Sequence, residues 1–375
     1  MTNKRFELTD EIIETADYGM HKLIDKNIKL NFDEISSFEF PLDEPFGLQV
    51  VYNNTIHCLV VKFSSKNKNL ICTGPGAHER DIIRNGELFK PPYIDRWSWY
   101  TFFDESFIAY ADPMFFYGEK IKIAWLIGTK EHWFLEDLSK IIEELCKNQE
   151  IRHDNILFCG SSGGGYTSVV LGTLIKNSQV LINNSQLFVM NYWESMVNPL
   201  FDVLYDSFVG MTKDEIVEKI KHRLDLIELF KKENYAPFIT YYVNAESEWD
   251  IKLHGMPFLK QIYKLKQFNG LEVVYYREIK DVPHEPMDPK KTVKVIKEYC
   301  KNYLYNTGET KIRTENQNIY IEGKYISQLE KQNKKLKKKN KKLKKENKEL
   351  LNSTSWKITS PLRKIKRYLK KIKIK

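Results

Sequence analysis

The chain has 375 residues, of which 42% are hydrophobic and 13% aromatic, so it can bury a large core and does not have the composition of a disordered protein. Its five cysteines are odd in number and widely spaced, which argues against a disulfide framework or a zinc site and favours a reducing compartment. The N-terminal segment lacks the apolar core of a signal peptide, and no stretch reaches the roughly 18 apolar residues of a spanning helix. We therefore expect a protein that is neither secreted by that route nor integral to a membrane.

The formal net charge of +9 is distributed unevenly along the chain. Residues 326–375 contain 20 Lys and Arg but only 3 Glu, whereas residues 1–325 contain 39 basic and 47 acidic residues. An acidic body therefore carries a strongly basic tail, and we expect the tail to be the part that meets an anionic partner.

The first predicted elements form an antiparallel start to a sheet. Residues 47–52 and 55–62 have strand-forming composition and are separated by Asn53 and Asn54, which tolerate positive φ, so they are predicted to form a hairpin. Further short apolar runs, of the kind buried in a parallel sheet, lie at 69–74, 106–113 and 122–128.

From residue 133 onward the predicted helices and strands alternate. Apolar residues at three- and four-residue steps predict helices at 133–148, 212–232, 256–267 and 288–303, the second opened by the capping-box pattern Thr212-x-x-Glu215. Apolar runs predict strands at 155–160, 187–193, 237–244 and 271–278. This order predicts an α/β protein with a mainly parallel, doubly wound sheet.

Residues 160–164 read Gly-Ser-Ser-Gly-Gly and fit the pattern G-x-S-x-G, directly after an apolar run and directly before a helix. This is the context of the nucleophile elbow in the α/β-hydrolase fold, where a strained turn lifts the serine out of the sheet and glycines avoid clashes with neighbouring backbone. The pattern predicts Ser162 as the nucleophile, because using Ser161 would place Cys159 at the first glycine position. A phosphate-binding loop is the alternative, but no Lys-Ser/Thr pair follows and no G-x-G-x-x-G register begins at Gly160.

A serine hydroxyl needs a base, and in this fold the chain order is Ser, acid, His. His284 lies in a proline-bounded loop between the last predicted strand and the last helix, and we expect it to be the general base, with a surface role as the alternative. The loop after the preceding strand offers Asp250, Glu246 and Glu248 as the acid. Asp250 is preferred because a Trp-flanked carboxylate entering a helix is more readily buried and fixed, and both glutamates remain alternatives. His254 is expected to pack beside Asp250, to contact substrate or to have a structural role.

Acyl chemistry also needs two N–H donors for the developing oxyanion. The amide of Gly163, after the nucleophile, would supply the first. The second comes from the loop after the third strand, where Pro75 has no N–H and Gly76 or Ala77 must donate. His78 in the same loop is a candidate substrate contact, with an exposed loop position as the alternative.

Several motifs lie between residues 45 and 305: PPYIDRWSW, AYADP, the GSSGGG elbow, the NNSQLFVMNYW run, and a D-x-x-x-H-x-x-P-F pattern at Asp250, His254, Pro257 and Phe258. With these features the segment resembles a group of bacterial α/β-hydrolase-like proteins linked to surface polysaccharide and glycoprotein biogenesis. The group includes capsule-biosynthesis proteins and the hydrolase-like component of the accessory Sec export system. This sequence reads GSSGGG where a small residue such as Ala often precedes the glycine pair in that group, a mild departure that leaves the catalytic serine in register.

This resemblance implies a triad of Ser162, Asp250 and His284 and acyl ester transfer or hydrolysis on sugar hydroxyls. It implies no resident cofactor; a transferase would use an acyl donor such as acetyl-CoA. Members of such groups can lose activity while keeping the fold, so a non-catalytic protein is the alternative.

The basic tail begins with a heptad pattern. Leu occupies every d position and Asn three consecutive a positions, at Ile326, Leu329, Asn333, Leu336, Asn340, Leu343, Asn347 and Leu350. The pattern predicts a parallel, in-register homodimer through a coiled coil, with a solvated single helix as the alternative because polar a positions weaken association.

The last twenty residues contain nine basic and no acidic side chains, with a recurring apolar stripe. Such a helix is predicted to lie in the headgroup layer of an anionic membrane, at the cytoplasmic inner leaflet. The stretch SWKITSPLR is similar to a tail of many bacterial cell-surface glycosyltransferases. Nucleic acid is a disfavoured partner, because the tail lacks spaced aromatics and the body is acidic.

The predicted organisation is an N-terminal segment of unknown role (1–45), an α/β-hydrolase domain (46–310), a linker (311–325), a coiled coil (326–352) and a membrane-binding tail (353–375). The expected function is a cytoplasmic, peripheral serine acyltransferase or esterase that transfers or removes O-acetyl groups on a capsular or lipid-linked glycan. The alternative is a non-catalytic scaffold of this fold that organises glycosyltransferases or glycoprotein export at the membrane.

Overall fold

The computed structural model describes residues 6–80, 83–84, 87–305, 334–335, 337–346 and 348–349. The chain divides into two compact units, Met1–Glu315 and Asn316–Lys375, and each is described by itself.

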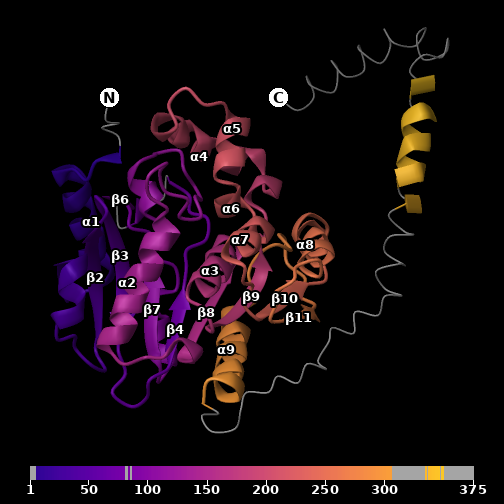
Figure 1. Ribbon diagram of the computed structural model, residues 1–375. Helices are drawn as coiled ribbons and strands as arrows, with labels where there is room; N and C mark the ends of the chain where they lie inside the picture. Colours follow the sequence, from indigo (N-terminus) through magenta and orange to yellow (C-terminus); the bar gives the residue numbers. More distant parts are fainter. Residues whose placement is uncertain are drawn as a thin grey trace, which may run out of the picture. The chain divides into compact units, whose positions relative to one another are not determined.

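A nine-stranded sheet forms the centre of the first unit, and its strands follow one another across Figure 1. In spatial order they are β1 (Asn27–Asn31), β2 (Pro45–Tyr52), β3 (Thr55–Lys62), β7 (Ser106–Tyr110), β4 (Leu70–Thr73), β8 (Ile156–Ser161), β9 (Gln179–Ser185), β10 (Ile239–Asn244) and β11 (Leu271–Tyr276). Within this sheet, β3 runs antiparallel to both of its neighbours, and every other neighbouring pair is parallel. A separate two-stranded ribbon joins β5 (Ile83–Arg84) and β6 (Glu87–Leu88).

The strand order defines the class of fold. Counted from β2 along the chain, the strands of the large sheet take the order 1-2-4-3-5-6-7-8, with the second strand reversed. This is the arrangement of the α/β-hydrolase fold, in which the nucleophile follows the fifth strand. Here the fifth strand is β8, and the residue after it is Ser162.

Helices cover both faces of the sheet. They are α1 (Asp10–Leu23), α2 (Phe134–Asn148), α3 (Ser162–Leu174), α4 (Glu194–Ser207), α5 (Lys213–Lys219), α6 (Lys221–Leu224), α7 (Leu226–Glu233), α8 (Met256–Ile262) and α9 (Pro289–Tyr303). Ala109 and Ala111 belong to the apolar cluster that includes residues of α1 and α9, whereas Tyr110 between them bonds Thr167 of α3 at 2.9 Å. Because successive strand residues point to opposite faces, α3 lies on the other side of the sheet from α1 and α9.

Several local predictions are confirmed. The hairpin of β2 and β3 turns at Asn53 and Asn54, both of which have positive φ. The Thr212–Glu215 capping box opens α5, and the helices predicted at 133–148 and 288–303 match α2 and α9. The N-terminal segment, for which the sequence suggested no role, contributes α1 and the edge strand β1.

Two predicted strands are wrong. Residues 122–128 are buried but irregular, because Trp125 and Leu126 have positive φ and the Leu126 N–H donates to the Asp112 carboxylate at 2.8 Å. Residues 187–193 contain a short 3-10 turn, and the strand of this region is β9, which lies just before them. A buried apolar run was mistaken for a strand in both cases, since burial alone does not fix the backbone conformation.

The helix predicted at 212–232 is divided into α5, α6 and α7. The break before α7 occurs at Asp225, whose carboxylate accepts from the N–H groups of Ile227 and Glu228 and caps the new helix. Helix α4 was not predicted. Helix α8 ends at Ile262, earlier than the predicted 267, and is preceded by a π-helix at Asp250–Gly255.

In the second unit, the described residues between 334 and 349 are helical, and their side chains are exposed. The Leu343 side chain is 50% exposed, and Lys342–Glu346 and Lys345–Glu349 form ion pairs at helical spacing. The coiled coil stays a prediction. The predicted linker (311–325) and membrane-binding tail (353–375) lie outside the described residues. Within the described parts of the chain, none of the helices has the length and apolar character needed to span a bilayer.

Candidate active site

The turn between β8 and α3 holds Ser162 in a strained conformation. Ser162 has φ of 52°, in the left-handed region that a non-glycine residue rarely adopts. The flanking glycines permit close backbone approach: a Cβ at Gly160 would lie 2.3 Å from the carbonyl oxygen of Gly164, and one at Gly164 would lie 2.6 Å from that of Gly74. The strand, the strained turn and the helix are therefore those of a nucleophile elbow.

The structure brings the predicted nucleophile, base and acid into one hydrogen-bonded chain. Ser162 Oγ lies 2.9 Å from His284 Nε2, and His284 Nδ1 lies 2.8 Å from Asp250 Oδ1. Asp250 is fully buried, and its second oxygen accepts from Ser247 Oγ at 2.6 Å. Because the Asp250 carboxylate only accepts, it selects the tautomer with the proton on Nδ1, and Nε2 is left to accept the serine proton.

The two alternative acids lie outside this chain. Glu246 is paired with Arg277 Nε at 2.5 Å, and Glu248 is paired with Lys252 on the protein surface. Both glutamates are exposed, and their carboxylates accept from surface cations instead of from His284. Asp250 is the carboxylate that meets the histidine, and it lies at the start of the π-helix Asp250–Gly255.

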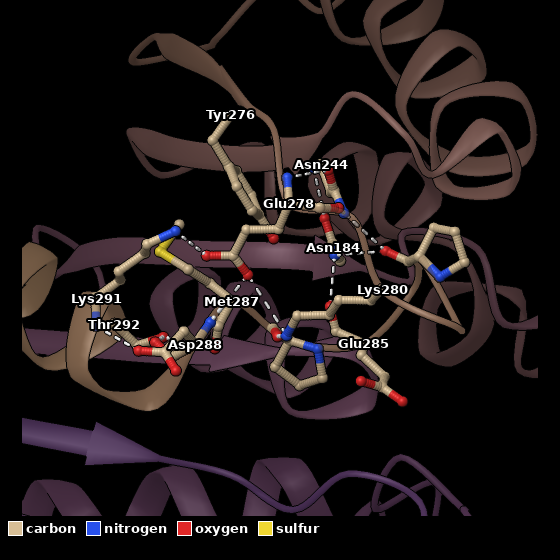
Figure 2. A network of polar contacts seen from close by, with 12 residues as sticks. Asn184, Asn244, Tyr276, Glu278, Lys280, Glu285, Met287, Asp288, Lys291 and Thr292 are labelled. Carbon is tan, nitrogen blue, oxygen red and sulfur yellow. Dashed lines mark hydrogen bonds and ion pairs between the residues drawn. The ribbon is translucent and has the colours of Figure 1, made fainter.

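Buried asparagines from two neighbouring strands fix the loop that carries His284, as Figure 2 shows. Asn184 Nδ2 donates to the carbonyl oxygens of Pro283, His284 and Glu285 at 3.4, 3.5 and 2.9 Å. Its side-chain oxygen accepts from the Asn244 N–H at 2.8 Å. The C-terminal ends of β9 and β10 therefore hold the backbone on both sides of the imidazole.

Glu278 ties the far end of the same loop to α9 (Figure 2). Its carboxylate accepts from Lys291 Nζ at 2.6 Å and from the Asp288 N–H at 3.2 Å, and Lys280 Nζ lies 3.5 Å away. The pKa of Glu278 is lowered because these hydrogen bonds and cations outweigh the opposing effect of burial. The loop is thus held between the sheet and the last helix.

Gln186 is a site residue that the sequence analysis missed. Its side chain is fully buried, its Oε1 accepts from Trp125 Nε1 at 2.7 Å, and its Nε2 donates to Ser162 Oγ at 2.9 Å. Because the indole N–H can only donate, it fixes which end of the Gln186 amide faces the serine. With one lone pair of Oγ occupied in this way, the serine proton is directed to His284.

Replacing Gln186 by leucine, which is close in size but has no donor, should lower the rate of acyl-enzyme formation by about 10- to 100-fold. The loss follows because the Trp125 N–H is left without its acceptor and the Ser162 hydroxyl loses the donor that orients it toward His284. Pre-steady-state release of the alcohol from an activated ester measures this rate. A Gln186→Leu protein that acylates at the wild-type rate would show that the amide does not position the serine.

Tyr192 is buried beside the nucleophile. Burial raises the pKa of Tyr192 to about 12, opposed by side-chain hydrogen bonds with Ser162 and Gln186. Its ring centroid lies 5.9 Å from those of both Trp125 and His284. The Tyr192 phenol therefore stays neutral near pH 7 beside the reacting oxygen.

His254 is buried and contributes to structure. Its Nδ1 accepts from the Leu187 N–H at 3.2 Å, directly after Gln186 in the chain. Burial, reinforced by the proximity of His284, lowers the pKa of His254 to about 3, so the ring is neutral near pH 7. Of the three predicted roles, the structural one fits this position.

Neutral His254 should make the protein less stable in acid. Its folded-state pKa lies below the ordinary value, so the unfolded chain binds the extra proton and stability falls as pH drops from about 6.5 toward about 3. A His254→Gln protein keeps an acceptor for the Leu187 N–H and does not titrate. Urea unfolding should show the advantage of wild type over this variant shrinking by about 1.4 kcal/mol per pH unit in that range. Parallel losses in both proteins would contradict this assignment.

The two backbone N–H groups expected to bind the oxyanion differ in whether another acceptor already occupies them. Gly163 is the second residue of α3, where the N–H has no acceptor within the helix. The Gly76 N–H donates to Asp95 Oδ2 at 2.6 Å, and that contact occupies it. Ala77 is exposed and is the remaining candidate of this loop.

His78 does not match the alternative of an exposed loop histidine. Its side chain is 15% exposed, stacks on Tyr93 with ring centroids 4.9 Å apart, and lies 3.3 Å from Asp95. These contacts hold the loop next to the nucleophile turn.

Among the residues that the structure describes, no group of three or more His, Cys, Asp or Glu side chains could hold a metal ion. The five cysteines are all buried as free thiols, and burial raises the pKa of Cys146 and Cys159 to about 12.

The fold and the elbow define an α/β-hydrolase-fold protein. A model of an uncharacterised protein family, UPF0227, matches residues 122–200, and no curated protein matches the chain. A histidine-to-alanine variant of the capsule O-acetyltransferase of Neisseria meningitidis serogroup A in complex with CoA is 15% identical, with a TM-score of 0.49 over 67% of this chain and 93% of that one.

Two other solved structures are similar at the same low level. Acetyl xylan esterase 1 from Thermoanaerobacterium is 12% identical, with a TM-score of 0.44 over 79% of this chain and 97% of that one. The glycosylation-associated Gap123 complex from Streptococcus agalactiae is 16% identical, with a TM-score of 0.43 over 70% of this chain and 47% of that one. The assignment of the fold rests on the strand order and the elbow of this chain.

Proposed function

We propose that this protein is a serine esterase or acyltransferase that forms an acyl-enzyme on Ser162. The observation that carries the proposal is the continuous chain from Ser162 Oγ through His284 to the buried carboxylate of Asp250, at 2.9 and 2.8 Å. Such a chain activates a hydroxyl that would otherwise be a poor nucleophile.

The proposed reaction uses each group in turn. His284 Nε2 takes the proton of Ser162 Oγ as that oxygen attacks the ester carbonyl, and the Gly163 N–H stabilises the oxyanion that forms. The intermediate collapses when the bond to the leaving alcohol breaks, and His284 returns the proton to that alcohol. Water or a second alcohol then attacks the acyl-enzyme through the same base, and Ser162 is regenerated. Asp250 stabilises the imidazolium in both halves of the reaction.

The substrate alcohol in this proposal is a sugar hydroxyl of a capsular or lipid-linked glycan, and the acyl group is acetyl. The support for the glycan is the sequence resemblance to proteins of surface polysaccharide biogenesis. For transfer, an activated donor such as acetyl-CoA would acylate Ser162, and the sugar hydroxyl would accept the acyl group. Removal of O-acetyl groups uses the same steps with water as acceptor.

The proposed location is the cytoplasmic face of the membrane. The basic, amphipathic segment 353–375 would attach to anionic headgroups, and the heptads of 326–352 would pair two copies of the chain. The support for both is the charge and heptad pattern of the tail.

The test is a pair of assays on the full chain. Acetate release from a sugar acetate measures hydrolysis, and mass spectrometry of an unacetylated oligosaccharide incubated with acetyl-CoA measures transfer. We expect at least one of the two products to form and its formation to require Ser162. A folded protein that yields neither product would contradict the proposal and favour the non-catalytic scaffold.

A further inference from the structure

Two tryptophans form a half-open aromatic surface beside His284. Trp193 precedes α4 and is 36% exposed, and Trp249 directly precedes Asp250. Their ring centroids are 5.5 Å apart, and the Trp193 ring lies 6.0 Å from the His284 ring. We call this pair the tryptophan platform. It joins a segment that follows β9 to a segment that follows β10, beside the catalytic base.

Buried aromatic rings support the tryptophan platform on its inner side. The Trp193 ring packs at 4.8 Å on buried Tyr192, whose ring in turn lies 5.9 Å from that of Trp125. A ring supported in this way loses little conformational freedom when a ligand covers it.

The shape and chemistry of the platform favour a sugar ring as its occupant. An indole face carries negative charge density, and the C–H bonds on one face of a pyranose present a complementary, weakly positive and apolar surface. An acyl chain instead needs an enclosed apolar cleft. The half-exposed Trp193 offers a flat surface, on which a ring can stack while its hydroxyls remain in water.

We propose that Trp193 and Trp249 bind the sugar ring whose hydroxyl carries or receives the acyl group. This inference rests on the proposed function, since it assigns the glycan to the alcohol side of the reaction. A ring stacked on Trp193 lies beside the imidazole that must take the proton from, or return it to, the sugar oxygen. The platform thereby explains how this site would select a sugar ester over other esters.

The test compares two acetate esters of polyols, glucose pentaacetate with a ring and triacetin without one. For Trp193→Ala, kcat/KM on glucose pentaacetate should fall about tenfold or more, whereas kcat/KM on triacetin should stay near the wild-type value. Trp193→Phe, which keeps an aromatic face, should recover part of the loss. Tyr263→Ala removes an exposed aromatic that packs on Phe268, away from the platform, and serves as the matched control.

Equal losses on both esters, or no loss on either, would overturn the platform. If wild type cleaves neither ester, calorimetric titration with glucose pentaacetate tests the platform without turnover, and the acetyl-CoA transfer assay tests the proposed function separately. Binding by wild type that weakens about tenfold in Trp193→Ala would support the platform. Unchanged binding in the variant, or no binding by wild type, would overturn it.

Discussion

Replacing Ser162 by alanine should lower ester hydrolysis or acyl transfer by about 10⁴-fold or more. No other hydroxyl can take its place at the elbow, because the left-handed turn directs this side chain toward His284 at 2.9 Å. The residual rate would come from oxyanion stabilisation and substrate binding alone. Steady-state acetate release from the purified full chain measures the effect.

Ser161→Ala is the matched control for this substitution. The Ser161 hydroxyl is adjacent in sequence but accepts from Arg96 at 2.5 Å and is not in the chain to His284. This variant should keep most of the wild-type activity, and both variants should unfold at temperatures close to that of wild type. Substantial activity in a folded Ser162→Ala protein would show that the nucleophile lies elsewhere.

Replacing Asp250 by asparagine should lower kcat by about 10³- to 10⁴-fold. Asparagine keeps the size of the side chain, but its amide nitrogen cannot accept from His284 Nδ1–H, so it favours the tautomer whose Nε2 carries a proton. That imidazole cannot take the proton of Ser162. The loss should therefore appear in kcat. KM should be much less affected, because Asp250 is fully buried and contacts His284, not the substrate.

Glu246→Gln and Glu248→Gln are the corresponding controls. Both residues were alternatives for the acid from sequence, and the structure pairs them with Arg277 and Lys252 on the surface. Each control should retain activity close to wild type. If one of them reproduced the loss and Asp250→Asn did not, the acid of the site would have been assigned to the wrong residue.

All three members of this hydrogen-bonded chain could be predicted from the sequence because each has a local signal. Ser162 lies in a glycine pattern between a strand and a helix, and His284 and Asp250 follow the last two strands, where the fold places its base and acid. The strand predictions at 122–128 and 187–193 failed for a different reason. Their apolar side chains are buried as in a strand, but the backbone is set by tertiary contacts such as that of Asp112 with Leu126.

The supporting residues could not be predicted in the same way. Gln186, Asn184 and Asn244 act across the sheet, on partners between 24 and 101 residues away. Their one signal in the sequence is a run of amide side chains where an apolar strand ends, since buried amides must find hydrogen-bond partners. Trp193 and Trp249 likewise meet only because two strand ends converge on His284.

A fluorophosphonate tests the central claim most directly. Ser162 Oγ, activated by His284, should displace the fluoride and form one covalent phosphonyl ester, which peptide mapping by mass spectrometry locates. We expect a single adduct on the peptide that contains Ser162 in wild type, and no adduct on that position in Ser162→Ala. A folded wild-type protein that remains unlabelled, or that is labelled at another residue, would contradict the account.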